Sequence, residues 1–282
     1  DVSEARELTA GLIGEHISRT RLPAALEILC AEYGYDLSFE LIDSANRTPF
    51  DFRATVDELR SWGWTGVTVT HPFKISAASY AADAMETAVS HLGAANTLIF
   101  DEDDVRGHNT DYTGFLSAWR ANMGDETPGR VAMAGAGGVA AALAPALLEL
   151  GAEEIALWDL DPAKATALKT KLNNKVRVVS ASEAIGATHE ADGLVNATAL
   201  GLAEYPGMAF AANAIGTQTW AFDAVYTPPE TLFLATARLA GLKPISGFEL
   251  FKHMALRTFA AYTSVMPDQR TMLPCLDSLR PK

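Results

Sequence analysis

The sequence predicts an α/β protein of two domains, each built on a mostly parallel sheet with helices on its faces. Strand-like segments alternate with helix-like segments over most of the chain, a pattern typical of parallel strands joined by helices. The chain has 282 residues, more than the roughly 100–200 residues of one ordinary domain. A glycine-rich turn at residues 135–138 lies between a strand-like and a helix-like segment and belongs to a second alternating series.

The first half of the chain gives a regular series of elements. β-branched and apolar runs favour strands, and apolar residues at a spacing of three and four favour helices. An acidic turn between two short strand-like runs is typical of a hairpin. The elements predicted in this half are a strand at 9–14, a helix at 22–33, a strand at 37–42, a helix at 52–62, a strand at 66–70, a helix at 73–89 and a hairpin formed by 96–100 and 105–107.

The second series begins after Thr127-Pro128-Gly129, which we interpret as a domain boundary because Pro and Gly interrupt regular elements. Asp161 before Pro162 is the expected N-cap of one helix. The elements predicted here are a strand at 130–134, a helix at 137–150, a strand at 154–159, a helix at 162–172, strands at 176–179, 193–196 and 220–223, and a helix at 248–262.

Composition excludes several classes of protein. Hydrophobic residues make up 49% of the chain, too many for a disordered protein. The formal net charge is −13, which argues against a nucleic-acid partner because such a surface needs clustered Lys and Arg. Cys30 and Cys275 are too few for a disulfide framework or a zinc site, and no other metal-ligand spacing occurs. With no apolar run of membrane-spanning length and no secretion leader at Asp1, we expect a cytoplasmic protein without membrane association.

A glycine-rich turn predicts a dinucleotide site. Glycines let the backbone turn tightly and approach a pyrophosphate, whose oxygens then accept hydrogen bonds from the N-terminus of the following helix. Asp159 closes the next strand, where a carboxylate accepts hydrogen bonds from ribose hydroxyls and repels a 2′-phosphate. No Arg flanks Asp159, so the pattern favours NAD over NADP. The residues of the turn are Gly135, Ala136, Gly137, Gly138 and Val139.

Two further residues are candidates for acid–base chemistry. Lys74 follows the strand predicted at 66–70, and Asp111 follows the predicted hairpin. Ligands of α/β proteins bind at the carboxyl ends of strands. A lysine and a carboxylate that meet there can share a proton with a substrate hydroxyl. An ordinary salt bridge is the commoner explanation of such a pair, so residue chemistry alone supports the catalytic interpretation only weakly.

Short motifs in a fixed order resemble the shikimate/quinate dehydrogenase family over about residues 11–265. The resemblance implies an N-terminal α/β substrate domain and a Rossmann-type, doubly wound NAD(P)-binding domain with a cleft between them. It places the substrate domain at 1–111, completed by 247–282, and the dinucleotide domain at 112–246. The motifs are Ser18-Arg19-Thr20, Thr70-His71-Pro72-Phe73-Lys74, Ala95-Asn96-Thr97, Gly107-His108-Asn109-Thr110-Asp111, Gly135-Ala136-Gly137-Gly138, Asn196-Ala197-Thr198, Asp223-Ala224-Val225-Tyr226-Thr227-Pro228 and Gly247.

The resemblance also implies a role for each matching residue. Lys74 and Asp111 are the implied catalytic pair, and the hydroxyls of Ser18 and Thr20 would bind a substrate carboxylate. Asn96 would act as donor and acceptor to ring hydroxyls. The other implied substrate contacts are Thr70, Tyr226 and Met254. The implied cofactor-binding residues are the turn 135–139, Asp159, Asn196, Ala197, Thr198, Ala224 and Gly247.

Two positions depart from the family pattern. Thr68 stands where the family usually has Asn, in a position that chiefly supports a turn. Met254 stands where the family has a Gln that binds substrate hydroxyls. A thioether cannot donate a hydrogen bond and accepts one only weakly. A substrate hydroxyl buried there without a partner would cost about 1–3 kcal/mol.

These observations predict an NAD(P)-dependent dehydrogenase that interconverts a secondary alcohol and a ketone on a shikimate- or quinate-like cyclic carboxylate, with NAD favoured. Met254 leaves open a related substrate, such as an aminoshikimate. A dinucleotide-binding protein without catalysis is the alternative from another class. The expected partner is a carboxylated cyclic alcohol, and the expected assembly is a monomer or a homodimer.

Overall fold

The computed structural model describes residues 5–282 and divides the chain into two compact units. Unit 1 comprises the described residues through Gly114 together with Lys252–Leu279. Unit 2 comprises Phe115–Phe251 and Arg280–Lys282. Two helices contribute residues to both units, α4 (Thr110–Met123) and α9 (Gly247–Thr263).

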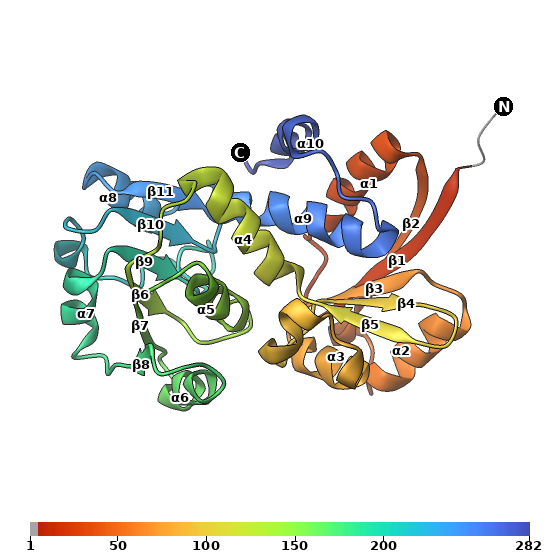
Figure 1. Cartoon of the computed structure of the whole chain (residues 1–282), viewed down its shortest axis with the longest axis horizontal. Coiled ribbons are helices and arrows are strands. Elements are labelled where there is room, and N and C mark those ends of the chain that lie inside the picture. The colour runs from red at the N-terminus through yellow and green to blue at the C-terminus, as the bar shows by residue number, and fades with distance from the viewer. Residues whose placement is uncertain (1–4) are drawn as a thin grey trace. The chain divides into compact units, whose positions relative to one another are not determined.

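Unit 1 contains a five-stranded sheet in the order β2-β1-β3-β4-β5 (Figure 1). β1 pairs in parallel with β2 and β3, whereas β4 pairs antiparallel with β3 and β5. The strands are β1 (Arg6–Gly14), β2 (Tyr35–Asp43), β3 (Gly66–Val69), β4 (Thr97–Phe100) and β5 (Val105–His108). The helices are α1 (Leu22–Tyr33), α2 (Phe52–Ser61), α3 (Lys74–Ala81) and α10 (Gln269–Leu276), with 3₁₀ turns at Ser44–Asn46, Ala82–Ala84, Thr87–Leu92 and Asp277–Leu279.

Local signals explain where these helices start and stop. Asp51 caps α2 by accepting a hydrogen bond from the Ala54 N–H. Gly34 ends α1 with a φ of 75°, a left-handed conformation that glycine adopts without a steric cost. The buried core of the unit includes Ile13 from β1 and Val67 from β3.

The helix predicted at 73–89 is wrong in its length. α3 ends at Ala81, and two short 3₁₀ turns follow it. Ala82 has a φ of 49°, which an α-helix cannot contain. Met85 instead forms a bridge to Gly107 of β5, where a Cβ on the glycine would lie 2.2 Å from the Met85 sulfur. Packing against β5 therefore overrides the high helix propensity of this Ala-rich segment.

Unit 2 contains a six-stranded, entirely parallel sheet in the order β11-β10-β9-β6-β7-β8. If β6 is counted as the first strand and the sheet is read from β8 to β11, the order is 3-2-1-4-5-6, which is that of a dinucleotide-binding Rossmann fold. The strands are β6 (Arg130–Ala134), β7 (Glu154–Trp158), β8 (Val176–Val178), β9 (Gly193–Asn196), β10 (Trp220–Asp223) and β11 (Lys243–Ser246). The helices are α5 (Ala140–Glu149), α6 (Pro162–Thr170), α7 (Ala184–Glu190) and α8 (Leu232–Leu239), with a 3₁₀ turn at Ala212–Ala214.

These two sheets confirm the predicted α/β class with an N-terminal α/β unit and a Rossmann unit. Asp161 caps α6 as predicted, because its side chain accepts a hydrogen bond from the Ala163 N–H. Sequence patterns missed α4, whose buried Trp119 packs edge-on against Trp220 of β10 with ring centroids 4.8 Å apart.

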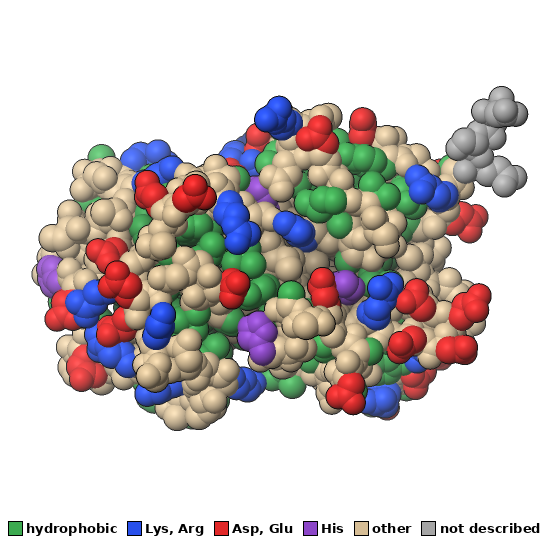
Figure 2. All heavy atoms as spheres, viewed as in Figure 1, with side chains coloured by type: hydrophobic (Ala, Val, Ile, Leu, Met, Phe, Trp, Pro, Cys, Tyr) green, Lys and Arg blue, Asp and Glu red, His purple; other side chains and the backbone are tan. Residues whose placement is uncertain are grey.

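On the face drawn in Figure 2, acidic side chains are interspersed with Lys and Arg and do not collect in one patch. Within residues 5–282, none of the helices is long and apolar enough to cross a membrane.

Candidate active site

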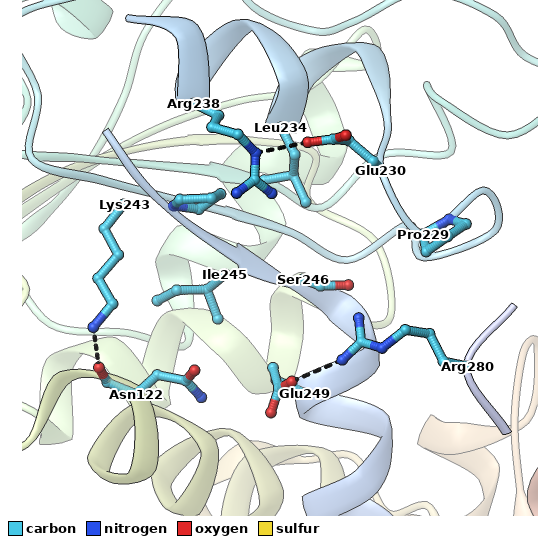
Figure 3. A pocket seen from close by; sticks show the side chains of 11 residues that line it. Asn122, Pro229, Glu230, Leu234, Arg238, Lys243, Ile245, Ser246, Glu249 and Arg280 are labelled. Carbon is cyan, nitrogen blue, oxygen red and sulfur yellow. Dashed lines mark hydrogen bonds and ion pairs between the residues drawn. The ribbon is translucent and has the colours of Figure 1, made fainter. Parts of the chain in front are cut away.

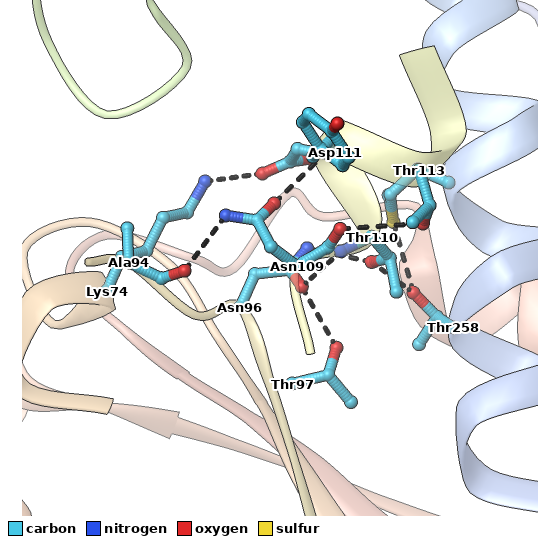
Figure 4. Close-up of polar contacts among 11 residues, drawn as sticks. Lys74, Ala94, Asn96, Thr97, Asn109, Thr110, Asp111, Thr113 and Thr258 are labelled. Atoms are coloured by element: carbon cyan, nitrogen blue, oxygen red, sulfur yellow. Dashed lines mark hydrogen bonds and ion pairs between the residues drawn. The ribbon is translucent and has the colours of Figure 1, made fainter. Parts of the chain in front are cut away.

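The side chains predicted to act in catalysis meet at one edge of the unit 1 sheet. β1, β3 and β5 run in the same direction and end at this edge, where β4 begins. Lys74 Nζ lies 2.6 Å from Asp111 Oδ2, and their side chains are 16% and 15% exposed (Figure 4). The pair is therefore largely shielded from water but still accessible to a ligand.

Asn109 holds both sides of this pair in place. Its Oδ1 accepts a hydrogen bond from the Tyr112 N–H at 3.1 Å in the first turn of α4, which carries Asp111. Its Nδ2 donates to the Ala94 carbonyl at 3.1 Å. The next residue, Ala95, donates its backbone N–H to the carbonyl of Lys74 at 2.9 Å. The backbones that carry the lysine and the carboxylate are thus linked through one buried amide side chain.

A chain of hydrogen bonds runs from Asn96 through Thr110 and Thr258 to Met254, and Figure 4 labels the first three of these residues. Asn96 Nδ2 donates to Thr110 Oγ1 at 2.8 Å, Thr110 Oγ1 lies 2.9 Å from Thr258 Oγ1, and Thr258 donates to the Met254 sulfur at 3.4 Å. Since Thr258 has one hydroxyl hydrogen and gives it to the sulfur, Thr110 must donate to Thr258. The thioether is the terminal acceptor of this chain.

The same contacts leave Asn96 only the donor part of its expected role as donor and acceptor to ring hydroxyls. Its Oδ1 already accepts hydrogen bonds from the Thr110 N–H at 2.8 Å and the Thr97 hydroxyl at 3.1 Å. A carbonyl oxygen has two lone pairs, so this oxygen has no acceptor capacity left for a ligand. One hydrogen on Nδ2 remains available for donation.

The remaining predicted substrate residues of unit 1 lie on loops after β1 and β3. Thr70 donates its backbone N–H to the Ile13 carbonyl at 2.9 Å. Its side chain packs against Gly14, where an added Cβ would lie 2.3 Å from the Thr70 methyl group. Ser18 is exposed and Thr20 half-buried. Thr20 Oγ1 accepts a hydrogen bond from the Leu22 N–H at 3.2 Å, so its own hydroxyl hydrogen is free to donate.

Asp43 at the end of β2 fixes the loop that carries Ser18. Its two carboxylate oxygens accept hydrogen bonds from the N–H groups of His16 and Ile17 at 3.1 and 3.3 Å. Partial desolvation would raise the pKa of Asp43, but these bonds and the one from the Ala45 N–H lower it below its ordinary value.

The departure at Thr68 has a local structural explanation. The Thr68 hydroxyl lies 2.6 Å from the Tyr262 hydroxyl on α9, and both residues are buried. Burial raises the pKa of Tyr262 above its ordinary value, so this phenol remains a neutral hydrogen-bonding group.

The glycine-rich turn of unit 2 has a backbone conformation that favours glycine at its first position. Gly135 has a φ of 98°, and a Cβ there would lie 2.6 Å from the Ala197 carbonyl oxygen. A Cβ added at Gly137 would meet no atom within 4 Å. The backbone of Gly137 therefore faces open space, as the predicted approach of a pyrophosphate needs. Gly138 and Val139 lead directly into α5 at Ala140.

Asp159 is fixed at the end of β7. Its Oδ2 accepts a hydrogen bond from the Ala136 N–H of the glycine-rich turn, and its Oδ1 accepts one from the Asp161 N–H, both at 2.8 Å. The side chain is half-buried. Turn and carboxylate are therefore held together at the carboxyl edge of the sheet.

Asn196 and Asp223 connect the loops that follow β9 and β10. Asn196 Nδ2 donates to Asp223 Oδ1 at 2.9 Å and to the Leu200 carbonyl at 2.9 Å, and its Oδ1 accepts from the Thr198 hydroxyl at 2.6 Å. Asp223 also accepts hydrogen bonds from the Val225 N–H at 2.9 Å and the Thr231 hydroxyl at 2.5 Å. Burial raises the pKa of Asp223 to about 6 although these three donors lower it.

The predicted residues at the end of β10 and the start of α9 lie close together. The Ala224 N–H donates to the Asn196 carbonyl at 3.0 Å. A Cβ at Gly247 would come within 2.5 Å of the carbonyl oxygens of Asp223 and Ala224, so only glycine permits this approach. The Tyr226 ring packs against Phe248 and Phe251, with centroids 5.8 and 5.7 Å away.

Sequence patterns missed four residues of these networks. Thr258 follows Met254 by four residues, and residues at this spacing are neighbours on one face of a helix. The contact between them could therefore have been predicted from the sequence. Thr231 is an N-cap, since its hydroxyl accepts a hydrogen bond from the Leu234 N–H. Asn109 and Asp223 occur inside the family motifs, but nothing local indicated their buried contacts. Among the described residues, no group of three or more His, Cys, Asp and Glu side chains is placed to hold a metal ion.

Comparison with known proteins identifies the family. The model of the shikimate dehydrogenase substrate binding domain matches residues 12–98. A quinate/shikimate dehydrogenase (NAD⁺) of Corynebacterium efficiens is 36% identical over 270 residues, which cover 93% of this chain and 95% of that protein. The chain belongs to the shikimate/quinate dehydrogenase family. A shikimate dehydrogenase (NADP⁺) of Streptomyces avermitilis is 34% identical over 270 residues, covering 93% of this chain and 92% of that protein.

Solved structures of the family have the same fold. Quinate dehydrogenase from Corynebacterium glutamicum in complex with NAD superposes with a TM-score of 0.90 at 31% identity, covering 97% of this chain and 99% of that one. Shikimate 5-dehydrogenase from Thermus thermophilus, in complex with NADP(H) and shikimate, superposes with a TM-score of 0.83 at 29% identity, covering 96% and 99%. Relatives in this family therefore include proteins named for NAD and proteins named for NADP.

Proposed function

We propose that the protein is an NAD-dependent dehydrogenase that interconverts a ring secondary alcohol and the corresponding ketone on a shikimate- or quinate-like cyclic carboxylate. The observation that carries the proposal is the contact of 2.6 Å between Lys74 and Asp111, shielded at the edge of the unit 1 sheet. An ordinary surface salt bridge would be exposed, and these two side chains are not.

Lys74 acts as the general acid and base for the reacting oxygen. In ketone reduction its ammonium donates a proton to the oxygen that becomes the alcohol, and in oxidation its amine takes that proton. Asp111 orients the lysine through their direct contact and accepts a hydrogen bond from a neighbouring ring hydroxyl. When bound by the glycine-rich turn and Asp159, NAD would supply the hydride chemistry of the reaction.

Hydroxyl groups on the loop after β1 bind the substrate carboxylate. Thr20 retains its hydroxyl hydrogen for donation, because its oxygen accepts from the Leu22 N–H. Ser18 is the second donor, on the loop that Asp43 fixes. Asn96 adds one Nδ2 hydrogen, and Thr70 follows β3 with its side chain against Gly14 at the end of β1.

The residues of unit 2 fit a dinucleotide. Open space over Gly137 admits a pyrophosphate next to the start of α5. The carboxylate of Asp159 at the end of β7 suits the hydroxyls of an unmodified adenosine ribose and repels a 2′-phosphate. Because both carboxylate oxygens are held by backbone N–H groups, the negative charge is fixed at that position. These contacts favour NAD over NADP.

Met254 favours a second candidate substrate. Its sulfur ends the hydrogen-bond chain from Asn96 and provides no donor. A cyclic carboxylate that carries a less polar group at this position, such as an aminoshikimate or a ring lacking one hydroxyl, would leave fewer groups unpaired than shikimate does.

A substrate screen tests the proposal. Shikimate, quinate and their analogues are each incubated with NAD and with NADP, and reduced cofactor is followed by absorbance. We expect turnover with at least one compound, faster with NAD, and a loss of about 10²–10⁴-fold in kcat in Lys74→Met with the affinity for NADH retained. Absence of turnover with every compound, together with normal NADH binding, would instead support the non-catalytic binding protein.

A further inference from the structure

A cavity of about 460 Å³ lies in unit 2 along the outer edge of β11 (Figure 3). β11 is the last strand of the six-stranded sheet. The Lys243 N–H donates to the Thr219 carbonyl beside β10, so the next residue, Pro244, turns its backbone outward. Proline has no N–H, and this edge therefore offers a poor template for another strand. The cavity is better suited to a small molecule.

The cavity is positively charged within an acidic chain. Its lining includes three cationic side chains and two carboxylates, which leave an excess of one positive charge, whereas the whole chain carries −13. The charged residues of the lining are Arg238, Lys243, Arg280, Glu230 and Glu249. None of them belongs to the residues proposed to bind substrate or dinucleotide.

Arg238 directs free donors into this cavity. Its Nε donates to Glu230 Oε1 at 2.7 Å, and among the described residues this is the one hydrogen bond or ion pair that the Arg238 side chain makes. Its two terminal nitrogens remain available, and they point toward Ile245 and Ser246 in Figure 3. A guanidinium oriented by one carboxylate presents its other nitrogens in the fork that a second carboxylate accepts.

Ser246 and Arg280 complete the set of polar groups. Ser246 Oγ accepts a hydrogen bond from the Phe248 N–H at 3.1 Å, so the hydroxyl hydrogen can be donated to a ligand. Arg280 is held by Glu249 at 3.1 Å and lies over the Phe248 ring at 4.7 Å. The positive charge of Arg280 is thereby fixed on the side of the cavity opposite Arg238 (Figure 3).

The floor of the cavity is apolar. Leu234 of α8 and Ile245 of β11 both line it, and both are buried side chains. An inorganic anion would not use such a floor. A ligand with an anionic head and an apolar body satisfies both parts of the lining.

We propose that this cavity binds a small organic carboxylate. The carboxylate accepts hydrogen bonds from the terminal nitrogens of Arg238 and the hydroxyl of Ser246, and the body of the ligand packs on Leu234 and Ile245. The site is separate from the proposed active site and does not depend on the proposed function.

A ligand-observed NMR titration of the whole protein tests this proposal with three probes. Benzoate has the carboxylate and an apolar body, acetate has the carboxylate alone, and inorganic phosphate is an anion without an apolar body. We expect saturable binding of benzoate at least about tenfold tighter than that of either other probe, since only benzoate covers the floor.

Three variants locate the site. Arg238→Gln should weaken benzoate binding at least about tenfold, because it removes the charged fork. Arg177→Gln is the matched control, since Arg177 Nε also donates to a glutamate at 2.7 Å but lies at the opposite edge strand, β8. Its benzoate affinity should equal that of the wild type. Ser18→Ala tests the other possible location, the proposed binding site of the substrate carboxylate. If benzoate binds there, this variant should weaken its binding.

The outcomes separate this site from the proposed active site. Binding lost in Arg238→Gln and retained in Ser18→Ala supports the proposal. Binding retained in Arg238→Gln overturns it, and if that binding is lost in Ser18→Ala, benzoate occupies the substrate site and the proposed function still stands. Phosphate binding as tight as benzoate binding would overturn the assignment to an organic carboxylate.

Discussion

Asp223→Asn is expected to change how the stability of unit 2 depends on pH. The Asp223 carboxylate is fully buried and accepts hydrogen bonds from Asn196, Val225 and Thr231. Burial raises its pKa from 3.8 to about 6, since desolvation outweighs the three donors. At neutral pH this group is therefore a buried charge that the folded state tolerates at a cost.

The sign and size of the effect follow from proton linkage. Between pH 3.8 and about 6 the folded state binds a proton that the unfolded state has released, so rising pH lowers the free energy of unfolding through this window. The difference between the two pKa values corresponds to about 3 kcal/mol at neutral pH. Asparagine cannot ionise and removes this dependence. It also loses an acceptor for Thr231, which costs about 1 kcal/mol at every pH.

Urea unfolding of the wild type and Asp223→Asn, from about pH 4 to about pH 7.5, measures the effect. The variant should be the less stable protein at the acidic end and should gain about 3 kcal/mol relative to the wild type as pH rises. Asp43, Glu154 and Glu183, whose pKa values are lowered, give the opposite slope but occur in both proteins and cancel. A difference in stability that does not change with pH would refute the reasoning.

Three further substitutions test the candidate site. Met254→Gln should raise kcat/KM for shikimate or quinate about 5–100-fold, because a donor then meets a ring hydroxyl; no gain for either compound would indicate a different substrate. Gly247→Ala should weaken NADH binding measured by fluorescence, because its Cβ would lie 2.5 Å from two carbonyl oxygens, and unchanged binding would contradict this. Asp159→Ala should lower kcat/KM for NAD about tenfold relative to NADP; an unchanged ratio would show that Asp159 does not select the cofactor.

The sequence was sufficient for most strands because each is a short β-branched or apolar run with a clear end. It failed at 73–89, where alanine composition favours a helix but Met85 packs against Gly107 of β5. No local pattern reports that contact, since the two residues come from different elements. It also missed α4, although the buried Phe115 and Trp119 stand four residues apart on one helix face.

Site residues were predictable to the extent that they lie at strand ends. Lys74 and Asp111 follow strands that end at the same sheet edge, so their proximity follows from topology once the sheet is predicted. The resemblance to the family then supplied roles that spacing alone left open. The buried amide of Asn109, which ties the two backbones together, depends on the conformation of both turns and has no signature in the sequence.

The interpretation of Met254 depends on contacts that the sequence does not reveal. From the sequence alone, the only expected effect of methionine at this position is the loss of a donor. In the structure the sulfur accepts the hydrogen of Thr258, whose oxygen accepts from Thr110, the residue directly before Asp111. A glutamine at this position could accept that hydrogen through Oε1 and still have its NH₂ group free for a substrate. The hydrogen-bond chain therefore tolerates either residue, and what differs between them is the donor offered to the ligand. For that reason Met254→Gln should leave stability and the Lys74–Asp111 contact unchanged, and any change in kcat/KM can be assigned to substrate recognition.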